Sequence, residues 1–182
     1  MSGAHSNRRG FGERSSPDRF RVLGLDPGLT CAGYGLVEQT AGTVRAIEYG
    51  AIRTPQGPVP ARLALLYDEL QSLLVRHRPE AVAVERVLFN ANVRTAMSVG
   101  QAAGVALLAA SQAGCEVAEY TPNEVKQTVA GYGAADKSQV QLMIARLLGL
   151  TSIPRPADAA DALGLALTHL QSRKLRGMAA RA

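Results

Sequence analysis

Four acidic residues occupy positions where a metal-dependent reaction could take place. Asp26 ends the first apolar run of the chain, and Glu85 directly follows a second one, residues 81–84. Asp158 and Asp161 are three residues apart at the start of the last predicted helix, so they share one face of it. If the strands that end at Asp26 and Glu85 are neighbours, both carboxylates reach the edge of a sheet where ligands of open sheets bind.

The chemistry of such a cluster follows from its charge. Two carboxylates about 5 Å apart repel by roughly 3 kcal/mol at an effective dielectric near 20. Four converging acids therefore need protons or a cation. Carboxylate oxygens suit Mg²⁺ or Mn²⁺, and no His or Cys cluster competes with them in the sequence. The pattern fits two-metal phosphodiester hydrolysis, in which one ion generates a hydroxide nucleophile and the other stabilises the leaving 3′-oxygen.

Each acid taken alone also has a purely structural interpretation. Asp26 precedes Pro-Gly and can be an Asx-turn residue. Glu85 can be a charge at a strand end that faces water. Asp158 can cap its helix, and Asp161 can interact with the positive end of the helix dipole. These alternatives stay open for the single residues, but they do not explain four acids meeting at one place.

Two lysines and an aromatic residue are candidates for contacts with nucleic acid. Lys126 and Lys137 flank the Gly-rich segment 131–133 near predicted helix starts, where they can contact phosphates or simply be solvated. Phe89 follows Glu85 closely and can stack on a base or anchor the next helix in the core.

The elements that must position these residues follow from the apolar patterning. Strands are predicted over residues 22–25, 31–37, 44–53, 81–84 and 115–120, with a hairpin turn over 40–43. Helices are predicted over residues 60–77, 93–112, from 122 to before 131, 136–148 and from 157 to about 175. A capping box at Thr121 marks one helix start. This order predicts an α/β fold with a mixed five-stranded sheet, a three-strand antiparallel meander plus parallel strands, flanked by helices.

Composition gives the domain organisation. A chain of 182 residues is expected to form one domain, here over residues 20–172. The net charge is +5, of which the first 20 residues contribute +2 and residues 171–182 contribute +4, leaving −1 for the rest. We therefore expect a disordered N-terminal arm over 1–19 and a basic C-terminal tail over 173–182. The basic total is weak support for a nucleic-acid partner, because the charge lies at the ends.

The cysteines and the hydropathy indicate the compartment. Cys31 and Cys115 are far apart without a CxxC motif, so we expect buried free thiols in a reducing environment. The longest apolar run, residues 102–110, is shorter than the roughly 20 residues that span a membrane. The N-terminus has no apolar signal-peptide region. The sequence predicts a cytoplasmic protein with no membrane association.

Four segments that contain these residues resemble one protein family. They are GLDPGLTCAGYGL, AVERVLFNANVRTAMSVGQAAGVA, TPNEVKQTVAGYGAADKSQVQ and PADAADALGLALTH. In this order, from about Arg21 to His169, the chain is similar to the RuvC family of Holliday-junction resolvases. The resemblance implies a ribonuclease H-like nuclease domain and a homodimer that nicks two opposed strands of a four-way DNA junction, using Mg²⁺ or Mn²⁺. It also implies a branch-migration complex as partner, a junction-binding subunit with its ATPase motor.

The resemblance assigns roles to residues. The catalytic and metal-binding acids of the family fall on the acids named above: Asp26, Glu85, Asp158 and Asp161. The DNA-contacting lysines fall on Lys126 and Lys137. Relatives commonly carry an aromatic residue at the position of Leu88, used against unstacked bases, and here the neighbouring Phe89 can take that role.

Two other classes of protein remain as alternatives. The segment LDPGLTCAGYG is similar to the phosphate-binding hairpin of actin-like kinases, which would make the chain an ATP-binding module, although about 150 ordered residues provide only one of the two lobes needed. A junction-binding protein without catalytic activity is the other, and the complete set of acids argues against it.

Overall fold

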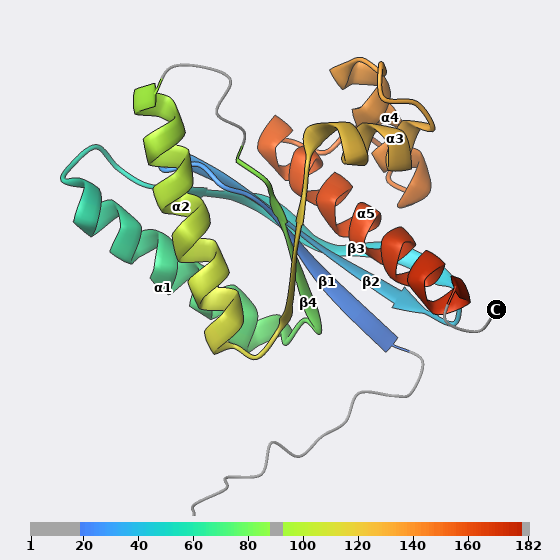
Figure 1. The fold of residues 1–182 in the computed structure, drawn as a ribbon, viewed down its shortest axis with the longest axis horizontal. Coiled ribbons are helices and arrows are strands. Elements are labelled where there is room, and N and C mark those ends of the chain that lie inside the picture. The colour runs from blue at the N-terminus through green and yellow to red at the C-terminus, as the bar shows by residue number, and fades with distance from the viewer. Residues whose placement is uncertain (1–18, 88–92, 180–182) are drawn as a thin grey trace, which may run out of the picture.

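The strands form a single mixed sheet with helices on both faces (Figure 1). The computed structural model describes residues 19–87 and 93–179. The strands are β1 (Arg19–Asp26), β2 (Cys31–Thr40), β3 (Thr43–Arg53), β4 (Ala81–Glu85) and β5 (Glu116–Tyr120). The helices are α1 (Val59–His77), α2 (Val93–Gln112), α3 (Pro122–Ala130), α4 (Lys137–Leu147) and α5 (Ala157–Ala179). Leu88, Phe89 and the predicted arm up to residue 18 lie outside the described residues.

The sheet order is β3-β2-β1-β4-β5, which confirms the predicted fold class. β1 pairs antiparallel with β2, and β2 with β3, so the chain opens as a meander. β4 runs parallel to β1, and β5 runs parallel to β4. The helical capping box at Thr121 is also confirmed, and a second one has Asp136 as its N-cap, so α4 begins one residue later than predicted.

Three predicted element ends are wrong by three or more residues. β1 begins at Arg19, three residues before the predicted residue 22. β2 continues past residue 37 to Thr40, because its polar residue Glu38 is buried and ion-paired within the sheet. α5 continues past Leu175 to Ala179, so residues 173–179, expected within a basic tail, are helical. The missed ends of β1 and β2 pair with each other, Arg19 with Thr40, so the ladder continues beyond the apolar runs that marked the two strands.

The core has two layers because alternate residues of a strand face opposite sides of the sheet. Leu23 and Val82 face α1 and α2, whereas Val22 and Ala83 face the layer formed by α3, α4 and α5. Figure 1 shows α1 and α2 together on one side of the sheet and α5 on the other. β1 and β4 are therefore covered on both faces, which explains their continuous apolar sequence.

Glycines let α5 lie unusually close to β1 and β2. A Cβ atom at Gly24 would overlap the carbonyl oxygen of Ala162, and one at Gly33 would overlap that of Asp158. A Cβ atom at Gly35 would lie 2.8 Å from the backbone nitrogen of Leu163. Because Gly24 and Gly35 are paired across the sheet, the three positions form one side-chain-free surface under the first half of α5.

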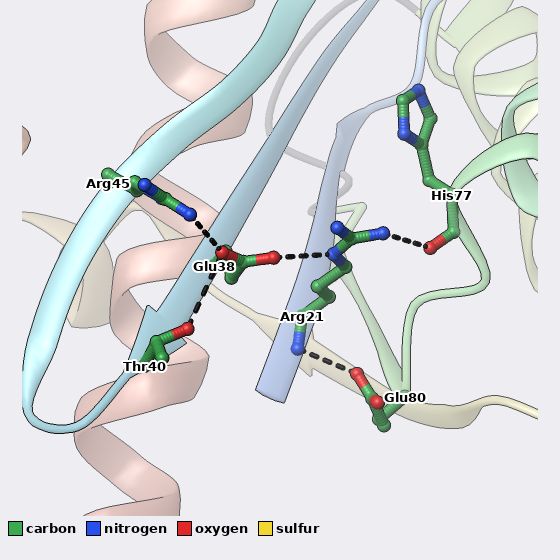
Figure 2. Close-up of polar contacts among 6 residues, drawn as sticks. All are labelled: Arg21, Glu38, Thr40, Arg45, His77 and Glu80. Carbon is green, nitrogen blue, oxygen red and sulfur yellow. Dashed lines mark hydrogen bonds and ion pairs between the residues drawn. The ribbon is translucent and has the colours of Figure 1, made fainter. Parts of the chain in front are cut away.

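A buried carboxylate joins the meander to α1 at the beginning of β1 (Figure 2). Glu38 accepts from Nε of Arg21 and from Nη2 of Arg45, both at 2.8 Å. Arg21 in turn donates from Nη1 to the carbonyl oxygen of His77 and from its backbone nitrogen to Glu80. The hydrogen bonds from Arg45, and then Arg21, hold the pKa of Glu38 below its ordinary value despite its burial.

The two cysteines are free but only half-buried, so the prediction of buried thiols is wrong. Cys31 begins β2 at an edge of the core, and Cys115 directly precedes β5. Within the described ranges, no helix has the length and apolar character needed to cross a membrane.

Candidate active site

The parallel pairing of β1 and β4 brings the first two predicted acids together. Leu25 pairs with Val84, so the residues that follow, Asp26 and Glu85, end neighbouring strands on the same edge of the sheet. The four residues directly before each acid are buried, whereas the two acids are half-buried. The strands therefore emerge from the core at these two carboxyl groups.

The packing of α5 adds the other two acids. Gly33 pairs with Asp26 across the β1–β2 ladder, and the backbone of Asp158 lies directly against Gly33. The carboxylate of Asp158 accepts a hydrogen bond from the thiol of Cys31 at 3.2 Å. Asp161, one helical turn further on, raises the pKa of Asp26 by its charge, as Asp158 does. All four predicted acids therefore lie at one edge of the sheet.

Burial and repulsion by the neighbouring carboxylates disfavour the charged form of Asp26 in this cluster. The pKa of Asp26 is raised to about 8, first because the group is buried and then because of Glu85, through its charge and as a hydrogen-bond partner. The charges of Asp161 and Asp158 add to this effect. Burial and the hydrogen bond to Asp158 also raise the pKa of the Cys31 thiol. Without a bound cation, the cluster retains a proton near neutral pH.

Of the two predicted lysines, Lys137 contacts one of the acids and Lys126 lines the same cavity as two of them. Nζ of Lys137 donates to Oδ2 of Asp161 at 2.7 Å, and this contact raises the pKa of the lysine. A cavity of about 270 Å³ has Lys126, Lys137, Glu85 and Asp161 among its lining residues, and apolar side chains of α3, α4 and α5 complete it. Two basic and two acidic residues thus line one cavity.

The donor set fits a hard divalent ion that the substrate helps to bind. In the part of the chain that the structure describes, no three His, Cys, Asp or Glu side chains are grouped so as to hold one ion by themselves. Mg²⁺ does not require such a cage, since it is usually held by one or two carboxylates together with water and substrate phosphates. Asp161 already forms an ion pair with the ammonium group of Lys137, so its carboxylate is accessible to a cation.

Sequence reasoning missed Cys31 as a neighbour of the site. Its position five residues after Asp26, at the beginning of the next strand, was the available signal. The base-contact candidates Leu88 and Phe89 stay predictions, because they lie outside the described residues.

The sheet order and the acids at the ends of β1 and β4 and the start of α5 define a ribonuclease H-like domain with a carboxylate cluster. A family model, crossover junction endodeoxyribonuclease RuvC, matches residues 22–169. The chain belongs to the RuvC family, and membership implies a dependence on divalent metal ions.

Individual relatives agree with this assignment. A RuvC of Syntrophomonas wolfei is 54% identical over 157 residues, which are 86% of this chain and 91% of the relative. The structure of Thermus thermophilus RuvC with a Holliday junction substrate is 41% identical, with a TM-score of 0.81 over 86% of this chain and 96% of that one. A yeast mitochondrial Holliday junction resolvase, 16% identical with a TM-score of 0.62, shares the fold. These similarities favour a junction endonuclease over an ATP-binding module or a catalytically inactive binding protein.

Proposed function

We propose that this protein is a structure-selective endonuclease that resolves Holliday junctions during recombination and repair. It nicks two opposed strands in a metal-dependent reaction and leaves 5′-phosphate and 3′-hydroxyl ends. The observation that carries the proposal is the convergence of Asp26, Glu85, Asp158 and Asp161 at one sheet edge of a RuvC-family chain. The Thermus thermophilus relative in complex with a Holliday junction supports the choice of substrate.

The acids would hold the metal ions from three packed elements. Asp26 and Glu85 belong to strands, and Asp158 and Asp161 to a helix packed directly on the same sheet. Two Mg²⁺ or Mn²⁺ ions bound here would supply an activated water and would stabilise the leaving 3′-oxygen. Groups on packed elements keep their geometry without substrate, so little reorganisation is needed when DNA binds.

Lys126 and Lys137 bind phosphate groups of the strand to be cut. Both line the same cavity as Glu85 and Asp161, so a DNA strand bound at these acids would have its phosphates within reach of the two ammonium groups. Lys137 is 63% exposed and so can exchange its contact with Asp161 for a phosphate oxygen. Leu88 or Phe89, which follow Glu85 in sequence, would contact unstacked bases at the junction.

Paired nicking requires two active sites with the symmetry of the junction. A homodimer with a two-fold axis supplies this arrangement. We further propose that the dimer works with a branch-migration complex, a junction-binding subunit and its ATPase motor, and that it does so in the cytoplasm, where free thiols persist.

Substitution of Asp158 by asparagine tests the proposal. We expect Asp158→Asn to bind a synthetic four-way junction but to lose Mn²⁺-dependent cleavage. The positions at which the unmodified protein cuts the junction DNA are mapped for comparison. Asp68→Asn, at an exposed position of α1, is the matched control and should cleave normally. Normal cleavage by Asp158→Asn would contradict the metal-site assignment, and measurable ATP binding without cleavage would favour the actin-like alternative.

A further inference from the structure

The thiol of Cys31 is the group that β2 presents to the acid cluster. Sγ of Cys31 donates to Oδ2 of Asp158 at 3.2 Å, across 127 positions of sequence. Cys31 is the first residue of β2, and it follows Asp26 after the short turn between β1 and β2. The contact therefore joins the strand beside Asp26 to the start of α5.

The same strand also holds the main chain of Asp158. Gly33, two residues along β2 from Cys31, lies against the carbonyl group of Asp158. β2 thus supports both the backbone and the carboxylate of this residue. Asp161 differs, since its partner Lys137 is an exposed, flexible side chain from α4.

We propose that Cys31 is a positioning residue, whose thiol orients the Asp158 carboxylate for binding of the divalent ion. The inference rests on the proposed function, in which Asp158 is a metal ligand. A carboxylate in the first turn of a helix can rotate about its side-chain bonds, and a hydrogen bond to one oxygen restricts that rotation. Partners that orient metal ligands are typically worth 10- to 100-fold in metal affinity. Because a thiol is a weak donor, we expect an effect of about tenfold, at the lower end of that range.

Mn²⁺ binding to the purified protein, followed by electron paramagnetic resonance, tests this role directly. We expect Cys31→Ala to bind Mn²⁺ about tenfold more weakly, and Cys31→Ser, which keeps a donor at the same place, to bind nearly as the unmodified protein does. Cys115→Ala is the matched control, because that thiol donates to the carbonyl oxygen of Pro79, near the start of β4, and should bind Mn²⁺ normally. Equal weakening by the alanine and serine variants would show that packing, and not the hydrogen bond, matters, and would overturn the proposal.

Asp158→Asn in the same titration distinguishes failure of the positioning role from failure of the metal site. If Asp158→Asn loses Mn²⁺ affinity and Cys31→Ala does not, the positioning role is wrong and the metal site stands. If Asp158→Asn binds normally, the assignment of Asp158 as a ligand fails first. An independent readout is the S–H stretching band of Cys31 in the Cys115→Ala background, which should shift when Asp158 is replaced by alanine. An unchanged band would contradict the hydrogen bond itself.

Discussion

Replacement of Gly33 by alanine tests whether the close packing of α5 on β2 sets the position of Asp158. The added Cβ atom would lie 2.9 Å from the Cβ atom of Asp158 and would overlap its carbonyl oxygen. Because the obstacle includes backbone, no change of rotamer removes it. The start of α5 must move away from the sheet, taking Asp158 away from Asp26.

The expected magnitudes have two parts. Overpacking of this kind costs about 1–3 kcal/mol, which for a chain of this size lowers Tm by about 2–12 °C at roughly 2–4 °C per kcal/mol. Ion binding stabilises the folded state by about 2.7 kcal/mol when the free ion is at a hundredfold its Kd. If affinity falls a hundredfold, the same ion concentration stabilises by only about 0.4 kcal/mol.

Thermal unfolding with and without Mn²⁺ measures both effects on one sample. Gly57→Ala is the control, since a Cβ atom there meets no other atom within 4 Å. We expect Gly33→Ala to have a lower Tm and a smaller increase in Tm on addition of Mn²⁺ than Gly57→Ala. A Gly33→Ala protein with unchanged Tm and an unchanged response to Mn²⁺ would refute the idea that glycine contact positions the acid.

Three further predictions concern charge. Since the folded state raises the pKa of Asp26 to about 8, the metal-free protein should lose stability as pH rises from about 4 to 8. Binding of Mn²⁺ at neutral pH should then release a proton, detectable by calorimetry in buffers of different ionisation enthalpy, and Asp26→Asn should abolish the release. Lys126→Gln and Lys137→Gln should each reduce the slope of log affinity against log salt for junction binding by about 0.9, whereas Arg146→Gln, at an exposed position of α4, should leave it unchanged. Glu38→Ala should lower the free energy of unfolding in urea by about 1.5–3 kcal/mol, because Arg21 and Arg45 each lose a charge-assisted hydrogen bond to a buried carboxylate. The pKa of Glu38 is lowered in the folded state, so the contribution of Glu38 to the free energy of unfolding should disappear as pH falls through that pKa. If the stability of Glu38→Ala falls with acid as steeply as that of the unmodified protein, this expectation is wrong.

Local sequence patterns predicted the order and type of the elements and the candidate acids of the site. Period-two and helical patterns reproduced β3 closely and α2 in full, and the capping box at Thr121 marked the start of α3. The four acids were recognisable because each lies where an apolar run ends or a helix begins. These are local properties, and local backbone preferences are encoded in neighbouring residues.

Which distant residues meet depends on how the elements pair and pack. The register of β1 with β4 places Asp26 beside Glu85, and the contact of Gly33 with α5 adds Asp158. The partnership of Cys31 with Asp158 depends on the same packing, as does the burial of Glu38 within a paired ladder. Register and helix packing depend on steric fit between segments far apart in the chain, and no local pattern in either segment specifies that fit.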